Sequence, residues 1–457
     1  MHWIRRLAGW IGILTLGCSF GIMESGQHAV AQQDSGAAPV LTLDEALTMA
    51  LAKNRSVKIA SLGADASRQQ ILVAKTKRFP SINTYVFGGE SLSTIGLTIK
   101  AGQFGSPSAT GPIPARDTTI SSSQTPTAFV IAQVSQPLLA LHKINLNILA
   151  ARLAADQASE QLRGTRQSIA ANVRQAYYGV VQAQEAVKAA QADLKQYQEL
   201  DRITTEYVTE QTALKSDSLQ VKAKLAAQEY SLLQMQDKQQ SAEESLNELM
   251  GRDLNERFRT APTEELLPAE EDLHLAQTQA LAQQSSIREA GLTVKQAEVQ
   301  RRLAKAQYLP ELNASVHYIS PFGISFLPSN IAAAGIEFKW DAFDWGGRGH
   351  TVQQKTIAVE QSKQQLEETK AQVLVNVDNV FRSLQEARVG VSVAKLAQEA
   401  AREKLSETTN QYAQKTALLR DVLQQQAAAQ GADAQYVQAV AAFWTSKANL
   451  DKAIGEE

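Results

Sequence analysis

Few residues of this 457-residue chain have the types and spacing that catalysis or metal binding requires. The histidines beyond the N-terminal segment lie far apart, without metal-ligand spacing. They are His142, His274, His317 and His350. We find no Walker loop, no G-x-S-x-G element and no G-x-G-x-x-G after a strand. The sequence therefore predicts no catalytic residue, no metal and no cofactor, and it argues against an enzyme.

Two acidic residues occur in a repeated context. Asp217 follows Thr212-Ala213-Leu214, and Asp421 follows Thr416-Ala417-Leu418 at the same spacing. Carboxylates that meet around a symmetry axis form a cation site and repel anions. Acids in the first turn of a helix are also favoured by the helix dipole alone. Both interpretations stay open at this stage.

These acids belong to an internal duplication. The positions that open the first copy recur 230 residues later, including Ala46 as Ala276 and Pro80 as Pro310. The positions around Asp217 recur 204 residues later. The difference indicates an insertion in the first copy, and insertions belong in surface loops. The same order of elements is therefore expected twice.

Each copy begins with a helical stretch, at residues 43–79 and 273–309, in which apolar residues recur near a 3.6 period. Long proline-free tracts end each copy. Residues 142–205 alone would make a helix of roughly 95 Å at about 1.5 Å per residue. Such a helix cannot fold back into a small core, so we expect long antiparallel helical hairpins that pack as coiled coils. Their Gln, Lys, Glu and Asp residues are expected to face water.

Short amphipathic strands separate these helical parts. Leu312, Ala314 and Val316 alternate with polar residues, which is the pattern of a two-faced strand. The expected strand pairs are 81–89 with 128–136 and 311–319 with 335–341, joined by loops at 88–127 and 319–334. Four strands are too few to close a membrane barrel, which needs about eight. Several chains must therefore pool their strands, unless the strands form a soluble sheet with one face on a core.

The N-terminus resembles a secretory signal peptide. Arg5 and Arg6 precede an apolar stretch, and Ala29-Val30-Ala31 offers a cleavage site. We expect cleavage after Ala31, and we disfavour lipidation at Cys18 because the preceding residues fit a lipoprotein signal poorly. The processed chain then lacks cysteine, which excludes disulfides and thiolate chemistry.

The charge balance gives no sign of nucleic-acid binding. The chain has 45 basic and 47 acidic residues, a formal net charge of -2, and no basic block. Aromatic residues make up only 6%, which is little for several compact cores.

These features resemble the TolC family of outer-membrane efflux and secretion channels. The resemblance rests on Leu41 to Leu47 with Asn54, on Tyr308-Leu309-Pro310, on Trp340 to Arg348, and on Asp421-Val422-Leu423. It covers nearly all of the processed chain. It implies a mainly α fold with a small β portion, in which long helical hairpins form an α-barrel. Three chains would supply a 12-stranded membrane β-barrel.

The resemblance also implies a function and partners. The protein would be a homotrimer in the outer membrane lipid, with a periplasmic extension. It would passively conduct substrates delivered by a periplasmic adaptor and an inner-membrane pump of the RND or ABC type, in efflux or type I secretion. Drugs, metal ions, polysaccharides and peptides or proteins all remain candidate substrates.

The resemblance places a gate at the periplasmic tip. Asp421 matches a ring aspartate, Asp217 matches an aspartate that contacts a tyrosine, and Tyr412 matches that tyrosine. The chain departs from the family at Gln424, which replaces a second acid, and at Ala417, which replaces an arginine. The tip glycines of the family are Gln211 and Lys415 here.

A second candidate feature is the strand-to-helix turn at Gly346-Gly347. Glycine allows the backbone to turn sharply from a strand into a helix.

The predicted organisation is therefore a signal peptide at 1–31, a first repeat at 32–251, an equatorial connector at 252–270 and a second repeat at 271–457. Two other functions were weighed. A periplasmic adaptor would need a β-rich domain flanking one hairpin. A non-conducting trimeric coiled-coil surface protein would lack two evenly spaced strand pairs.

Overall fold

The computed structural model describes residues 39–90, 96–121, 126–261, 272–324 and 327–456. Val40–Glu457 forms one compact unit. The predicted signal peptide at 1–31, with Cys18, lies outside the described residues, and so does most of the second half of the predicted connector.

Two runs of helices and strands repeat the same plan, with nearly equal lengths. The first run comprises α1 (Leu43–Lys53), α2 (Arg55–Thr76), β2 (Ser81–Glu90), β5 (Pro126–Pro137), α3 (Leu141–Thr209) and α4 (Lys215–Met250). The second comprises α5 (Leu273–Gln283), α6 (Ser285–Ala306), β7 (Glu311–Phe322), β8 (Ile331–Lys339), α7 (Gly347–Ala413) and α8 (Leu419–Ile454). Helices α3 and α7 have 69 and 67 residues, and α4 and α8 have 36 each. The mainly helical, duplicated fold that the sequence predicted is confirmed.

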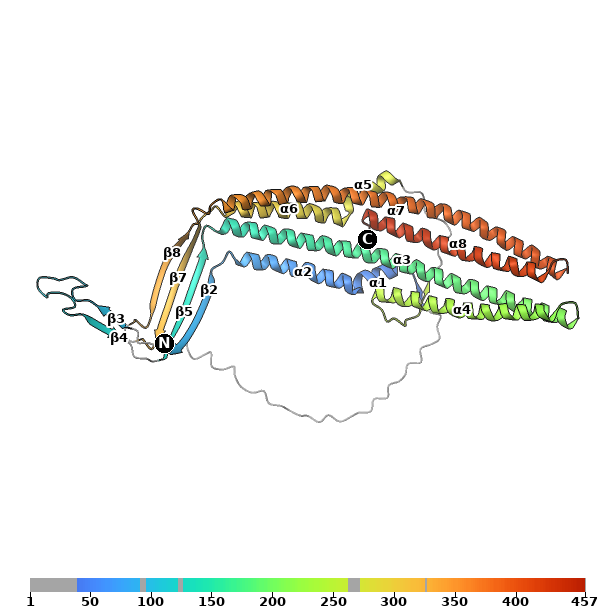
Figure 1. Ribbon diagram of the computed structural model, residues 1–457, viewed down its shortest axis with the longest axis horizontal. Coiled ribbons are helices and arrows are strands. Elements are labelled where there is room, and N and C mark those ends of the chain that lie inside the picture. The colour runs from blue at the N-terminus through green and yellow to red at the C-terminus, as the bar shows by residue number, and fades with distance from the viewer. Residues whose placement is uncertain (1–38, 91–95, 122–125, 262–271, 325–326, 457) are drawn as a thin grey trace, which may run out of the picture. The chain divides into compact units, whose positions relative to one another are not determined.

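The long strands form one antiparallel sheet in the order β2-β5-β7-β8. Each strand is followed or preceded by its own helix, so the sheet continues into four helical columns (Figure 1). Next to the sheet, α3 packs against α2 and α6; beyond them it packs against α4 and α8. The columns are therefore α2 then α4, the unbroken α3, α6 then α8, and the unbroken α7. Two continuous helices thus hold together two interrupted ones.

The predicted helical stretches 43–79 and 273–309 are each broken once, at equivalent residues. Asn54 and Gln284 adopt extended backbone between α1 and α2 and between α5 and α6. The Asn54 side chain accepts a bond from Ser56 N (2.8 Å) and donates to Leu249 O (2.9 Å). Gln284 repeats this arrangement with Ser285 N (2.9 Å) and Ala453 O (3.3 Å). Each break is therefore capped by its own amide and attached to the end of a long hairpin.

A glycine completes each attachment. Gly251 and Gly455 end α4 and α8 with left-handed φ angles of 66° and 90°. A Cβ on Gly251 would lie 2.9 Å from Lys53 O, and one on Gly455 would lie 3.0 Å from Gln283 C. Both the backbone angle and the close approach therefore require glycine.

The buried cores repeat the same positions. Leu246 and Met250 of the first copy are fully buried, as are their equivalents Leu450 and Ile454 (0% and 4% exposed). One cluster joins α1, α3 and α4, and the other joins α5, α7 and α8. A short parallel pair, β1 (Val40–Leu41) with β6 (Arg259–Thr260), borders the first cluster, which contains Leu41 and Phe258. The predicted connector therefore contains a two-residue strand that pairs with the start of the described chain.

The strands differ from the sequence prediction in extent. β8 covers Ile331–Lys339 rather than 335–341, because Ile331 to Gly335 pair with β7 despite a weak alternation of side-chain types. The prediction of a continuous loop at 88–127 was partly wrong. Within it, β3 (Gly96–Ile99) and β4 (Thr118–Ser121) form a hairpin, where the hydroxyls of Thr98 and Thr119 lie 3.0 Å apart. The insertion in the first copy thus carries secondary structure of its own.

We predict that Gly251→Ala destabilises the fold by about 2 kcal/mol or more, since a left-handed alanine alone costs roughly 1–2 kcal/mol and the new Cβ meets Lys53 O. Thermal unfolding followed by the helical circular dichroism signal measures this effect. Gly431→Ala is the matched control. Its Cβ meets nothing within 4 Å inside α8, so this variant should be neutral or slightly stabilising. Equal melting temperatures for Gly251→Ala and the unmodified protein would contradict the prediction.

Candidate functional site

The two hairpin tips have the same backbone geometry. In the first, Gln211 has φ 56° and Thr212 N donates to Tyr207 O (2.8 Å). In the second, Lys415 has φ 59° and Thr416 N donates to Gln411 O (2.9 Å). This pattern is the Schellman helix end, in which a left-handed residue reverses the chain. The duplication therefore extends to the outermost turn of each hairpin.

Gln211 and Lys415 occupy positions that favour glycine. A left-handed residue with a Cβ costs roughly 1–2 kcal/mol, and the two tips carry one each. Lys415 has a contact that offsets part of this cost, because its Nζ lies 5.2 Å from the centre of the Tyr207 ring. Both tips are therefore strained turns, in agreement with the glycines that the resemblance implied at these positions.

Asp217 and Asp421 are the third residues of α4 and α8. Asp217 accepts from Leu214 N (3.4 Å) and Asp421 from Leu418 N (3.2 Å), so each carboxylate caps its own helix. Arg420 Nε lies 3.4 Å from Asp421 Oδ1, and the Asp421 side chain is 42% exposed. Within one chain, both acids therefore act as caps of their own helices. Asp421 Oδ2 accepts the capping bond and Oδ1 faces Arg420, while the side chain stays partly exposed to water.

Tyr412 lies in a small core between the two hairpins. Its ring is 9% exposed and lies 5.9 Å from that of Tyr207, centre to centre. The Thr204 hydroxyl donates to Leu200 O (2.7 Å). Burial raises the pKa of Tyr412, the Thr204 side chain acts against this shift, and the nearby Tyr207 and Asp217 add to it. Tyr412 is therefore a buried tyrosine that packs against Tyr207, with Thr204 and Asp217 near its hydroxyl.

The neighbours of Tyr412 in this core come from three other helices, α3, α4 and α8. They are Tyr197, Leu200, Val221, Leu419, Val422 and Leu423. The core therefore joins the two hairpins near their tips.

A polar network joins α3, α7 and α8 farther from the tips than the Tyr412 core. The sequence predicted that these residues face water, so the network was missed. Gln426 Nε2 on α8 donates to Asp193 Oδ1 on α3 (3.2 Å). About two turns further along α8, Asp433 accepts from Gln398 Nε2 (2.9 Å) and Arg402 Nε (2.8 Å) of α7. Burial raises the pKa of Asp193. No sequence signal could have found this network, since its members are up to 233 residues apart.

The turn from β8 into α7 is built around Asp344. Gly346 has φ 88° and precedes the first residue of α7, Gly347. The Asp344 carboxylate accepts from Arg348 N (2.6 Å) and Arg348 Nε (3.1 Å), and these hydrogen bonds hold its pKa below the usual value. A Cβ on Gly347 would lie 3.3 Å from Asp344 Oδ2. The two glycines thus serve different needs, a left-handed turn and room for a carboxylate.

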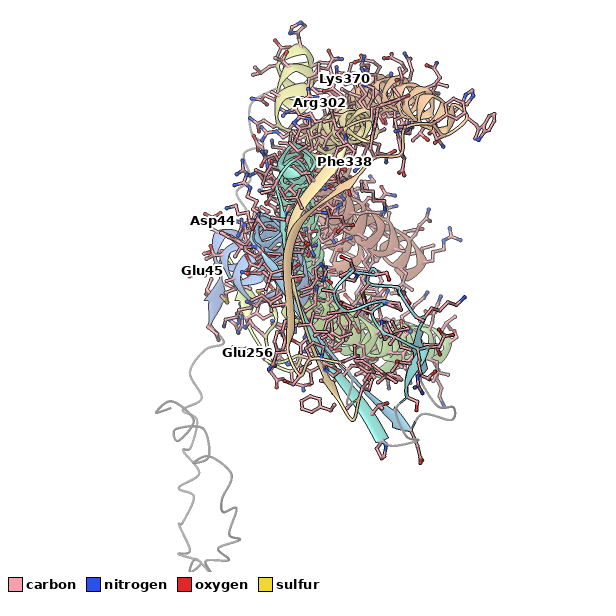
Figure 2. The ribbon with its side chains drawn as sticks, turned by 90° about the vertical axis from the view of Figure 1, so that its left-hand side faces the viewer. Asp44, Glu45, Glu256, Arg302, Phe338 and Lys370 are labelled. Atoms are coloured by element: carbon pink, nitrogen blue, oxygen red, sulfur yellow. The ribbon has the colours of Figure 1, made fainter. Side chains whose placement is uncertain are left out.

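Large aromatic side chains project around this turn. Trp340, Phe343 and Trp345 are 54%, 72% and 88% exposed. Figure 2 labels Phe338, at the helix end of β8, which is 60% exposed. Aromatic residues are enriched where a membrane protein leaves the bilayer. The helix end of the sheet therefore has the composition of a membrane–water boundary.

Among the residues that the structure describes, no group of His, Cys, Asp and Glu is arranged to hold a metal ion. Within the same residues, no helix combines the length and apolar character needed to cross a membrane.

We predict that Gln211→Gly stabilises the first tip by about 1 kcal/mol, because it removes the strain of the left-handed glutamine. Hydrogen exchange of the amides between Tyr207 and Asp217 should slow. Lys415→Gly is the comparison variant, and it should gain less because it also removes the contact with Tyr207. Faster exchange in Gln211→Gly would show that the side chain itself holds the turn.

Three solved structures share the fold along nearly the whole chain. The outer membrane protein VceC of Vibrio cholerae is 18% identical, with a TM-score of 0.69 over 91% of this chain and 96% of its own. The CmeC outer membrane channel of Campylobacter jejuni is 14% identical, with a TM-score of 0.71 over 96% and 94%. The open-state MtrE outer membrane channel of Neisseria gonorrhoeae is 18% identical, with a TM-score of 0.69 over 91% and 89%. No curated protein matches the chain in sequence.

A family model matches both repeats. The model described as outer membrane efflux protein covers residues 46–252 and 277–456. The match includes the hairpin tips, the strand-to-helix turn and the duplicated breaks at Asn54 and Gln284. The resemblance to the TolC family is thereby confirmed. The chain belongs to the outer membrane efflux protein family.

Proposed function

We propose that this outer-membrane efflux channel works as a homotrimer, in which three sheets close a 12-stranded barrel and three sets of columns form a periplasmic tunnel. The observation that carries this proposal is the four-stranded sheet with two open edges, continued strand by strand into helical columns. A substrate would enter at the hairpin tips and leave at the strand loops.

The open edges of the sheet support closure by further copies. β2 and β8 are edge strands, and every residue of both is exposed. Unpaired backbone groups are costly within a bilayer, so each edge needs a partner strand. Pairing of β8 with β2 of the next chain leaves no edge. The strands of 9–12 residues have the length that a tilted membrane strand requires, about 9–11 residues.

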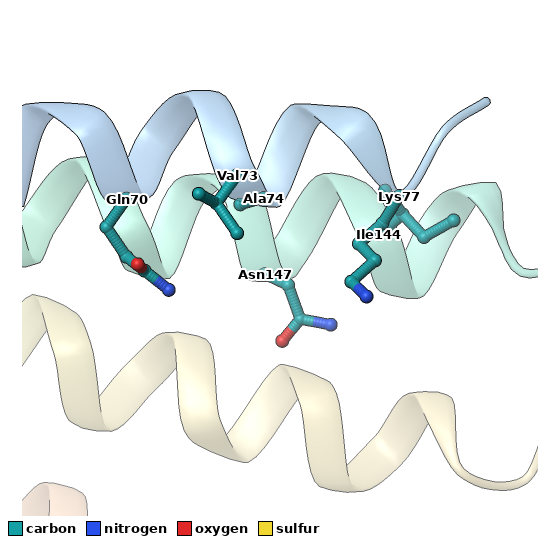
Figure 3. A pocket seen from close by; sticks show the side chains of 6 residues that line it. All are labelled: Gln70, Val73, Ala74, Lys77, Ile144 and Asn147. Atoms are coloured by element: carbon teal, nitrogen blue, oxygen red, sulfur yellow. The ribbon is translucent and has the colours of Figure 1, made fainter. Parts of the chain in front are cut away.

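The outer helical columns also expose apolar surface that a neighbouring chain would cover. The residues are Ile59, Leu62, Leu72 and Val73 on α2 and Ile357, Val375, Val389, Val393 and Leu396 on α7. Between α2 and α3 lies an open groove of about 480 Å³ (Figure 3). It is lined by Gln70, Val73, Ala74, Lys77, Ile144 and Asn147. In a ring of columns, α7 of the next chain would lie beside α2 and cover its apolar residues.

The domain boundaries follow from the same plan. We propose repeats at 32–251 and 271–457, joined by an equatorial connector at 252–270, and removal of residues 1–31 as a signal peptide. The equal element lengths and the repeated attachments at Asn54 and Gln284 support this division.

The energy for transport would come from partners. We propose docking to a periplasmic adaptor and an inner-membrane pump of the RND or ABC type. Membership of an efflux family favours efflux over type I secretion. The family match spans both repeats, and it supports neither a periplasmic adaptor nor a non-conducting surface coiled coil.

The tips would form the gate. Three copies of Asp421 around the axis would form a ring of carboxylates that attracts cations and repels anions. Tyr412, with Asp217 close by, would hold the α7–α8 hairpin against α3 and α4 in the closed state. The partial exposure of the Asp421 side chain at the start of α8 supports this role.

We expect the purified protein to migrate as a heat-sensitive trimer from outer-membrane fractions and to conduct ions in planar bilayers. Boiling should convert the trimer to monomers, because the strand edges and outer columns are satisfied only between chains. A folded monomer without conductance would refute the proposed function.

We predict that Asp421→Asn lowers the cation-to-anion permeability ratio several-fold in planar bilayers. Asparagine keeps an oxygen that can cap Leu418 N, so the variant removes charge while the helix start is retained. Asp217→Asn is the matched control, since it removes the equivalent charge from the first hairpin. A permeability ratio that is unchanged by Asp421→Asn would rule out the aspartate ring.

A further inference from the structure

The strand register divides the side chains of the sheet into two faces. One face, here called the outer face, carries mostly apolar residues along its whole length. Examples are Val86, Val130, Val134, Val316, Ile336 and Phe338. Its pairs include Ile82 with Val134, Val134 with Val316 and Leu312 with Phe338. A continuous apolar face of this kind suits lipid.

The opposite face, here called the inner face, carries the remaining side chains of the four strands. In a closed membrane barrel one face of the sheet meets lipid and the other lines the lumen. Because the outer face is the more uniformly apolar of the two, the inner face becomes the wall of the lumen when the sheet closes.

The inner face changes character along the strands. Near the helices it is polar, with Ser81 paired to Ser135, Ser135 to Ser315, and Gln133 to both Asn83 and His317. Toward the loops it is apolar. Ile319 pairs with Ile131 and Ile331, Tyr85 pairs with Ile131, and Phe87 pairs with Phe129. A wet lumen predicts polar residues throughout, so the apolar part is unexplained by membrane insertion.

We propose that these apolar side chains form a collar that binds solutes with large apolar groups as they leave the channel. The collar residues are Tyr85, Phe87, Phe129, Ile131, Ile319 and Ile331. The proposal rests on the proposed trimeric barrel, in which three copies of the collar face one another across the lumen. Lipid cannot cover the collar, because the same strands present their other face to lipid.

The collar has the right place to select among solutes. Barrels of about 8 strands are filled by their side chains, and barrels of 16–18 strands leave an aqueous channel. At 12 strands, two rings of large side chains narrow the opening considerably. Apolar constrictions disfavour hydrated ions. A solute that buries CH₂ groups against them gains roughly 0.8 kcal/mol for each.

The test uses potassium current through the full-length trimer in planar bilayers, with symmetric quaternary ammonium ions as probes. Tetrabutylammonium should block the current at a concentration about tenfold lower than tetramethylammonium, since its butyl groups contact the collar. In the double variant Phe87→Ser with Phe129→Ser, the two probes should block equally and the conductance should rise. Val130→Thr is the control. It lies between Phe129 and Ile131 on the outer face and should leave conductance and block unchanged.

A milder pair keeps the test decisive if the serine variant does not assemble. Phe87→Tyr with Phe129→Tyr adds two hydroxyls at nearly constant volume and should reduce the preference for tetrabutylammonium. An unchanged preference in whichever variant conducts overturns the collar while the channel itself stands. Absence of trimers or of any current from the unmodified protein refutes the proposed function instead.

Discussion

A β-strand that crosses a bilayer must find every hydrogen-bond partner within protein, and this constraint governs the whole chain. Four strands in one sheet form hydrogen bonds only along the three boundaries between them. The outer edges of β2 and β8 therefore depend on other copies of the chain. Each strand is continuous with the helix at one of its ends, so the helical columns follow the same order as the strands. Closure of the strands therefore brings the helical columns into a ring as well. One backbone requirement thus sets both the barrel and the tunnel.

The duplication also provides two equivalent junctions that hold the interrupted helical columns against the continuous helices α3 and α7. Asn54 and Gln284 use one side chain both to cap the next helix and to bind the end of a distant hairpin. Gly251 and Gly455 let the two backbones approach within van der Waals distance. The junction is held by amide side chains that donate to backbone carbonyls and by two buried cores. Movement during gating is therefore expected beyond the junction, toward the tips.

The tips have the opposite character. Their turns place Gln211 and Lys415 in left-handed conformations, and their helices begin with exposed leucines capped by acids. The small apolar core around Tyr412 and the polar network around Asp193 and Asp433 tie α7 and α8 to their neighbours. Local opening at the tips would have to break these contacts while the junction stays closed. A strained end on a rigid support is the arrangement that a gate requires.

The sequence by itself determined the repeats, the long helices and the paired strands, because period and spacing are local properties. The family resemblance singled out Tyr412, Asp217 and Asp421 as gate residues, and these roles stay a proposal. The sequence also indicated the family, and the match across both repeats confirmed it. Tertiary structure alone decided that Asn54 and Gln284 break the first helices, that residues 96–121 form a hairpin, and that Tyr412 packs against Tyr207. It also decided which acids are buried, since Asp193 and Gln426 meet across 233 residues. The physical reason is that helix and strand patterns record which side of an element is covered, whereas the identity of the covering residue depends on register between elements. In this sheet the register also brought together the apolar collar on the inner face, which the sequence of a single strand does not show.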